Sequence, residues 1–108
     1  MANRLDRWAD PPLLVLASLA EGPKHGYAIS QDVARTMGVR LSPGTLYAVI
    51  ARLESLSLIE PLQSADRRRP YRITAAGAEA LAQQSARMGE VATLAQRRLG
   101  GRPGWTEA

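Results

Sequence analysis

The sequence predicts a mostly α-helical fold with one small β-hairpin, arranged as a winged helix-turn-helix that a long C-terminal helix follows. Two segments of helical periodicity begin near residues 26 and 43 and are joined by a short connection, which is typical of a helix-turn-helix. A hairpin with a basic tip follows directly, as a wing would, and a further helical pattern extends to residue 99. We expect four parts: a short helical lead-in (1–10), the winged helix-turn-helix (11–74), a dimerisation helix (75–99) and a disordered tail (100–108).

The first apolar segment predicts a helix that begins after Asp10. Asp10 is a favourable N-cap, Pro11 suits the first helical position, and nearly every residue from 13 to 20 is apolar. Gly22 and Pro23 then end the helix. Because a helix that is apolar on all sides must be covered on all sides, we expect one side to face the core and the other a partner subunit.

The second helix is predicted from about Gly26 to Met37, and Gly38 ends it. Residues 39–41 are too few for anything but a turn with a small strand. The residues expected to form the buried stripe of this helix are Tyr27, Ile29, Val33 and Met37.

The third helix is predicted to begin at Pro43, because Ser42 supplies an N-cap oxygen and proline is well tolerated at the first helical position. Apolar residues then recur three and four apart and should face the core. They are Leu46, Val49, Ile50, Leu53 and Leu56.

The opposite side of this helix carries unusually small residues, with Tyr47 on one flank and Arg52 on the other. The small residues are Gly44, Ala48, Ala51 and Ser55. A helix that enters a DNA major groove about 12 Å wide benefits from an outer face without bulky side chains. We therefore predict that this is a DNA recognition helix, with Thr45 and Ser42 at its start discriminating bases.

The wing is predicted from two short apolar stretches that flank a polar tip at residues 63–69. Pro61 and Pro70 each remove a backbone donor, so both strands should be short. Three consecutive arginines, Arg67 to Arg69, lie at the tip, where they favour contact with phosphates or the minor groove.

The last helix is predicted to start after Thr74 as N-cap and to end at a glycine-rich cluster after Leu99. At about 1.5 Å per residue it would exceed 35 Å, too long for one small domain to cover, so it should pack against its own copy. Residues of the first and last helices are expected at a dimer interface. They are Leu13, Leu16, Leu81, Met88, Val91, Leu94, Ala95 and Leu99.

Composition limits the function. The chain has 108 residues and a formal net charge of +4, and 13 of its 14 basic residues are arginine. It has no cysteine and one histidine, His25, so neither a metal site nor a catalytic constellation is expected, and the chain should not be an enzyme. No cofactor is implied. No apolar run could span a membrane, and a cytoplasmic, nucleoid-associated location is expected.

Three motifs together resemble one family. They are "LLVLASLAEGPKHGYAIS", "LSPGTLYAVIARLESLSLIE" and "RRRPYRIT". Over about residues 13–80 the chain resembles the PadR-like winged-helix transcriptional regulators, in their shorter branch with one C-terminal helix. The resemblance implies a homodimeric repressor of double-stranded DNA, with a pseudo-palindromic operator and often a small apolar or aromatic effector or a stress signal.

The resemblance also implies which residues face DNA. Two departures matter: Arg69 and Pro70 replace a lysine and a tyrosine common in family wings, and the last helix has no aromatic residue to sandwich a drug. Ala48 and Arg52 join the DNA-facing set from their place on the third helix. The implied residues are Tyr27, Ser42, Gly44, Thr45, Tyr47, Arg67, Arg68, Arg69 and Tyr71.

Several alternatives remain open at this point. Tyr47 could pack on the hairpin as well as touch a phosphate, and a hairpin acid could hold Arg52. The whole domain could instead be a winged-helix protein-interaction module without DNA affinity.

Overall fold

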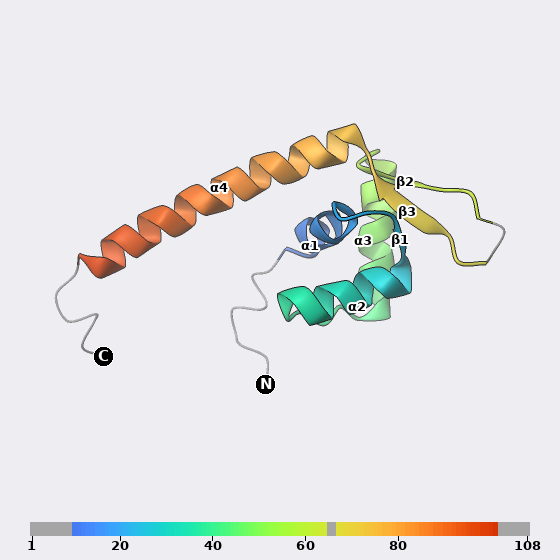
Figure 1. Cartoon of the computed structure of the whole chain (residues 1–108), viewed down its shortest axis with the longest axis horizontal. Helices are drawn as coiled ribbons and strands as arrows, with labels where there is room; N and C mark the ends of the chain where they lie inside the picture. The colour runs from blue at the N-terminus through green and yellow to red at the C-terminus, as the bar shows by residue number, and fades with distance from the viewer. Residues whose placement is uncertain (1–9, 65–66, 102–108) are drawn as a thin grey trace.

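The structure, a computed structural model, describes residues 10–64 and 67–101, which form a body and an arm (Figure 1). Within these residues, three helices and a small antiparallel sheet make up the body, and the fourth helix extends away from it. The fold is the mostly helical winged helix-turn-helix that the sequence predicts. The elements are α1 (Pro11–Leu19), β1 (Lys24–His25), α2 (Gly26–Met37), α3 (Pro43–Ser55), β2 (Ile59–Pro61), β3 (Pro70–Ile73) and α4 (Ala75–Gly100).

A core of aliphatic side chains from α1, α2, α3 and β2 holds the body together. Two predicted core residues do not belong to it. Tyr27 is 63% exposed, because it lies two residues from Ile29 and therefore on the opposite side of α2, and Leu56 is 54% exposed, because α3 ends one residue before it. The buried residues are Val15, Leu16, Leu19, Ile29, Val33, Leu46, Ile50, Leu53 and Ile59.

The chain itself covers most of α1. This helix packs against α2, α3, α4 and β3, and Leu16 is only 5% exposed in a single chain. The expectation that Leu16 faces a partner subunit is therefore wrong, whereas Leu13 remains half-buried. Asp10 occupies the N-cap position of α1, but its side chain makes no capping hydrogen bond.

The predicted boundaries of α2 and α3 are confirmed by the cap residues. The Thr45 N–H donates to Oγ of Ser42 (3.2 Å) at the start of α3, and Gly38 ends α2 in the left-handed conformation (φ 73°). The start of α2 is capped by His25, in keeping with its interpretation as a local cap or turn residue: the Ala28 N–H donates to Nδ1 of His25 (3.3 Å).

The wing is a three-stranded antiparallel sheet in the order β1-β3-β2. Its two main strands are short, as the prolines predict, and Glu60 of β2 lies opposite Arg72 of β3. The third strand is Lys24–His25, which pairs with Tyr71 and Pro70. The small strand expected at residues 39–41 is therefore wrong, because this edge of β3 is covered by the segment before α2.

The arm, α4, begins where the sequence predicts. The Gly77 N–H donates to Oγ1 of Thr74 (3.0 Å), and Gly77 is buried. Leu81 packs on the core, but every described residue of α4 beyond it is exposed. The helix includes Gly100, so the predicted tail does not begin there.

Some expectations fall outside these elements. The predicted lead-in at residues 1–9 and the tail at residues 102–108 lie outside the described residues. Across residues 10–64 and 67–101, no helix combines the length and apolar character needed to cross a bilayer.

Candidate nucleic-acid interface

The small-residue face of α3 is at the surface, opposite the buried Leu46, Ile50 and Leu53. A Cβ added at Gly44 would meet nothing within 4 Å, so the space in front of the N-terminal turn is open. We call this face the α3 ridge. Its members are Gly44, Ala48, Ala51 and Ser55, and all four are exposed.

The start of α3 presents hydroxyl groups to solvent. Ser42 Oγ accepts from the Thr45 N–H and lies 3.0 Å from Oγ1 of Thr45. Both side chains are exposed. This pair holds the Thr45 hydroxyl in a defined position at the end of the ridge, where it can act as a donor or an acceptor.

Tyr47 lies beside the ridge and against the start of α2. Its side chain is 53% exposed, and a Cβ added to the buried Gly26 would be 2.7 Å from the Tyr47 Oη. The hydroxyl end of the ring therefore packs on the first residue of α2, while about half of the Tyr47 side chain stays exposed. A half-buried tyrosine of this kind can pack and also donate a hydrogen bond.

An open hollow of about 360 Å³ lies where α2, α3 and the wing meet. We call it the wing hollow. Three tyrosines and three arginines give it both hydroxyl donors and positive charge, the groups that usually contact phosphate oxygens. Its lining is His25, Gly26, Tyr27, Tyr47, Arg67, Arg68, Arg69 and Tyr71. The structure thus brings together predicted residues from three separate segments of the chain.

The tyrosines of the wing hollow are oriented by their neighbours. The Gln31 side-chain amide donates to the Tyr27 Oη (3.1 Å), which leaves the hydroxyl proton of Tyr27 to donate elsewhere. Tyr71 is half-buried and packs on the core from β3.

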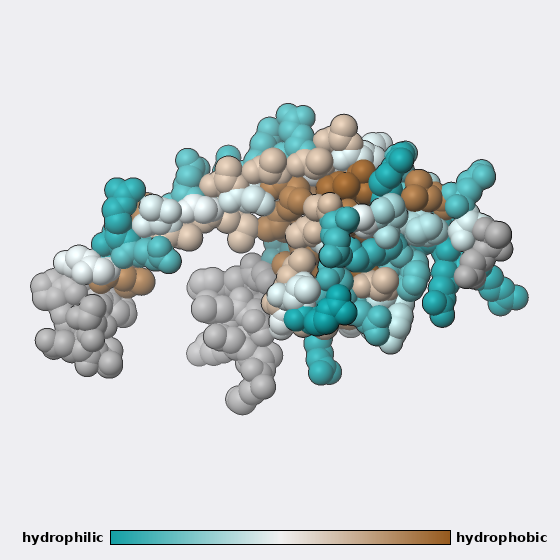
Figure 2. Space-filling model, in the orientation of Figure 1, coloured by the Kyte–Doolittle hydropathy of each residue, from teal (hydrophilic) through white to brown (hydrophobic). Residues whose placement is uncertain are grey.

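The arginines of α3 and the wing lie at the surface. Arg52 and Arg67 to Arg69 are exposed, and the wing carries one of the hydrophilic surfaces visible in Figure 2. Arg72 is exposed as well and pairs with Glu60 across the two strands, where its Nε lies 3.1 Å from Oε2. Among the described residues of the hairpin, Glu60 is the acidic one, and it pairs with Arg72 rather than with Arg52.

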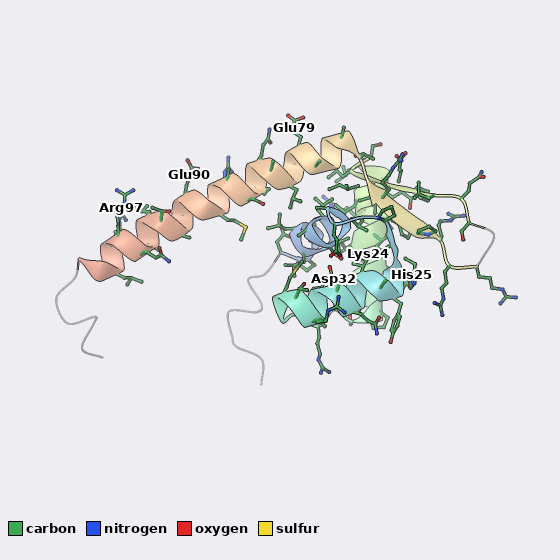
Figure 3. The ribbon with its side chains drawn as sticks, in the orientation of Figure 1. Lys24, His25, Asp32, Glu79, Glu90 and Arg97 are labelled. Carbon is green, nitrogen blue, oxygen red and sulfur yellow. The ribbon has the colours of Figure 1, made fainter. Side chains whose placement is uncertain are left out.

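A polar cluster that joins α1, β1 and α2 around the buried Ser18 and Asp32 was not predicted. Ser18 donates to Oδ2 of Asp32 (2.7 Å), and Lys24 contacts the same carboxylate (3.8 Å), the Ser18 carbonyl oxygen and Glu21 (2.8 Å). Figure 3 shows Lys24 and Asp32 close together beside α1 and α2. The cluster fixes β1, and hence the wing sheet, to both helices. The sequence contained a signal for this cluster: Asp32 lies three residues after Ile29, which puts a carboxylate on the core side of α2, where it needs a partner.

The residues predicted at the dimer interface lie mainly on one side of α4. Figure 3 shows Glu79, Glu90 and Arg97 on the side of α4 that points away from α1 and α2. The opposite, apolar side has no cover within the described chain beyond Leu81, as the exposed residues at its surface show. They are Met88, Val91, Leu94, Ala95 and Leu99.

Comparison with known proteins gives a family match and two curated relatives. The family model "Transcriptional regulator PadR-like family" matches residues 15–83. The chain is 38% identical over 92 residues to a transcriptional regulator of Mycobacterium tuberculosis, and the alignment covers 82% of each protein. It is also 46% identical over 79 residues to an uncharacterized 37.1 kDa protein in transposon TN4556 of Streptomyces fradiae. That alignment covers 73% of this chain but only 23% of the longer protein.

Solved structures with similar folds include two regulators. A PadR family transcriptional regulator from Eggerthella lenta is 29% identical with a TM-score of 0.77, and the match covers 91% of this chain and 88% of that one. A PadR-like transcriptional regulator from Bacillus cereus is 23% identical with a TM-score of 0.78, covering 93% of this chain and 100% of that one. At this identity, the second likeness shows the fold alone.

Proposed function

Since the chain belongs to the transcriptional regulator PadR-like family, and is thus a DNA-binding transcription regulator rather than an enzyme, we propose that it represses transcription by binding a pseudo-palindromic operator as a homodimer. The observation that carries the proposal is the exposed α3 ridge beside the wing hollow. It combines a face that can approach bases closely with a lining that can hold the DNA backbone.

In this proposal α3 enters the major groove. The α3 ridge lies toward the groove floor, and Thr45, with Ser42 behind it, makes the base contacts that discriminate sequence. Arg52, exposed and one turn after Ala48, reaches a phosphate at the edge of the groove. The ridge itself only permits approach, so sequence preference depends on the first turn of the helix.

The wing hollow holds the DNA backbone. Tyr27, Tyr47 and Tyr71 donate hydrogen bonds to phosphate oxygens, and Arg67 to Arg69 supply the positive charge that releases counterions. These contacts set the position of α3 without reading bases. The arginines also extend to the neighbouring minor groove, where a narrow groove concentrates negative potential.

A second copy of the chain binds the second half-site. The uncovered apolar side of α4 supports pairing through these helices, since an exposed stripe of this length is costly in water. Two-fold symmetry then places two recognition helices on half-sites about one helical turn, roughly 10 bp, apart. Leu13, half-buried on α1, lies in the set proposed to join this interface.

Regulation follows from the same geometry. A small apolar effector between the paired α4 helices would change their angle and hence the spacing of the recognition helices. Because α4 has no Trp, Tyr or Phe, such a ligand would pack on aliphatic side chains. A regulator of this kind works at the nucleoid, and we place it in the cytoplasm on that ground.

The proposal is tested by selecting bound sequences from a random pool of DNA duplexes. The expected result is an enriched inverted repeat whose half-sites are about 10 bp apart. Enrichment of an asymmetric site would contradict the homodimer. If no sequence were enriched and no salt-dependent binding to DNA were detected, the protein-interaction module would be favoured. Repression is tested separately, by transcription from a promoter that carries the selected operator.

A further inference from the structure

We propose that Gly26, the first residue of α2, positions Tyr47 for its contact with DNA, because the missing Cβ leaves the space that the tyrosine ring occupies. The inference rests on the proposed function and adds a residue that touches no DNA itself. It concerns how the wing hollow is assembled between α2 and α3.

The contact at Gly26 is unusually close. A Cβ at this position would lie 2.7 Å from Oη, 2.9 Å from Cε1 and 2.9 Å from Cζ of Tyr47. Ordinary van der Waals contact starts at 3.4 Å, so a Cβ at this position would reach ordinary contact with the Tyr47 Oη only if the ring moved by about 0.7 Å. The three atoms belong to the hydroxyl end of the ring, and both Gly26 and Tyr47 line the wing hollow.

The backbone does not explain why a glycine occupies this position. The described glycines with a positive φ are Gly22 and Gly38, and Gly26 is not among them. In the first position of a helix, alanine is accepted as readily as glycine and is the better helix former. What remains is the space that Tyr47 requires.

Moving the ring should affect DNA binding more than folding. Tyr47 is more than half exposed, so its ring can turn outward without disturbing the core. A hydrogen bond to a phosphate, by contrast, tolerates only a few tenths of an ångström beyond its usual 2.7 to 3.0 Å or so. A displacement of about 0.7 Å therefore removes the hydroxyl from a phosphate held by Arg67 to Arg69.

The test is a double-mutant cycle between Gly26 and Tyr47, measured as affinity for the selected operator. Gly26→Ala should weaken binding about tenfold, the usual effect of losing one hydrogen bond to a charged group, and should leave the melting temperature unchanged or higher. In a Tyr47→Ala background, the same change should alter affinity by less than about twofold, because there is no ring to displace. Equal reductions in both backgrounds would overturn the inference.

The salt dependence separates Tyr47 from the wing. A tyrosine hydroxyl releases no counterion, so Gly26→Ala should leave the slope of affinity against salt unchanged. A flatter slope would mean that the arginines had moved, and would also overturn the inference. Gly89→Ala is the matched control, since a Cβ at Gly89 in α4 meets nothing within 4 Å, and it should not change affinity.

Two further outcomes are decisive. If Gly26→Ala failed to fold, the double variant should recover folding, and a failure to recover would show that the Tyr47 ring is not the obstacle. If the unmodified chain bound no selected DNA, the proposed function would fall together with the inference. Operator binding that Gly26→Ala leaves unchanged would remove the inference alone.

Discussion

Gly77 lies in the first turn of α4, directly against the backbone of the segment that follows α3. A Cβ here would be 2.0 Å from the carbonyl oxygen of Leu58, and that oxygen also accepts the Thr74 N–H (3.0 Å). Backbone cannot turn aside as a side chain can. We expect Gly77→Ala to lower the free energy of unfolding by about 3 kcal/mol, measured by urea denaturation. The control is again Gly89→Ala, which should raise it slightly by improving helix propensity.

Ser57 is the opposite case: its backbone conformation favours glycine, but the residue is a serine. It follows α3 with φ 60°, and the Leu58 N–H donates to the Leu53 carbonyl (2.9 Å) while the Ser57 N–H donates to Glu54 (3.0 Å). This is the C-terminal motif in which a left-handed residue, usually glycine, ends the helix.

Ser57→Gly should therefore stabilise the fold by about 1 kcal/mol, because it removes the steric cost of the left-handed backbone. The measurement is the midpoint of urea unfolding. Ser55→Gly, at the last residue of α3, should shift that midpoint the other way, because it replaces a helical residue and removes the hydrogen bond from Ser55 Oγ to the Arg52 carbonyl. Destabilisation by both changes would mean that the Ser57 side chain matters more than its backbone.

Among the single elements, α3 allows the sharpest test of the proposed DNA contact. Ala51→Glu places a negative charge where the proposal puts the groove floor, so operator affinity should fall about 100-fold or more. Because Ala51 is exposed, the melting temperature should hardly change. Thr93→Glu, an exposed position on α4, adds the same charge away from the ridge and is the control. Retained affinity in Ala51→Glu would mean that another face of the body meets DNA.

The wing arginines should act through their charge. Replacing Arg67, Arg68 and Arg69 with alanine should weaken binding to all sequences alike and flatten the salt slope by about 0.9 for each phosphate that no longer meets an arginine. Titrations of operator and random duplex across a range of salt concentrations test this. A slope equal to that of the unmodified chain would remove the wing arginines from the proposed interface.

The elements also show what the sequence could predict. Caps and periodicity are local, and they placed Ser42, Pro43, Gly38 and Thr74 correctly, as well as the hairpin. What could not be predicted depends on pairing between distant segments. The strand at Lys24–His25 exists because β3 lies beside it, and neither residue carries a strong strand signal of its own.

In the candidate site, too, local features could be predicted from the sequence and contacts between distant segments could not. The small face of α3 could be predicted from spacing, and its exposure is confirmed by the structure. The packing of Tyr47 on Gly26 and the cluster around Asp32 both join residues from different elements. Residue type alone does not predict the environment of Tyr27: it is aromatic, but its position puts it on the exposed side of α2, opposite Ile29.

For the whole molecule, the question is what covers the arm. Beyond Leu81, α4 extends away from the body with an apolar side and a charged side (Figures 1 and 3). Val91 is 61% exposed and Leu94 is 44% exposed in the single chain. Burial of several such side chains would contribute about 1.5 to 3 kcal/mol each, which is enough to drive association. A second copy provides a matching stripe by symmetry.

Val91→Glu combined with Leu94→Glu should therefore convert the protein from dimer to monomer, as measured by sedimentation at micromolar concentration. Operator affinity should fall with it, because one half-site alone supplies about half of the contacts. The double change adds four carboxylates to the proposed apolar interface, where burial of unpaired charge is costly. At about 3.6 residues per turn, Thr93 lies on the side of α4 opposite Val91. The Thr93→Glu variant should therefore stay dimeric. An unmodified chain that sediments as a monomer would contradict the interface, and a double variant that stays dimeric would place it elsewhere.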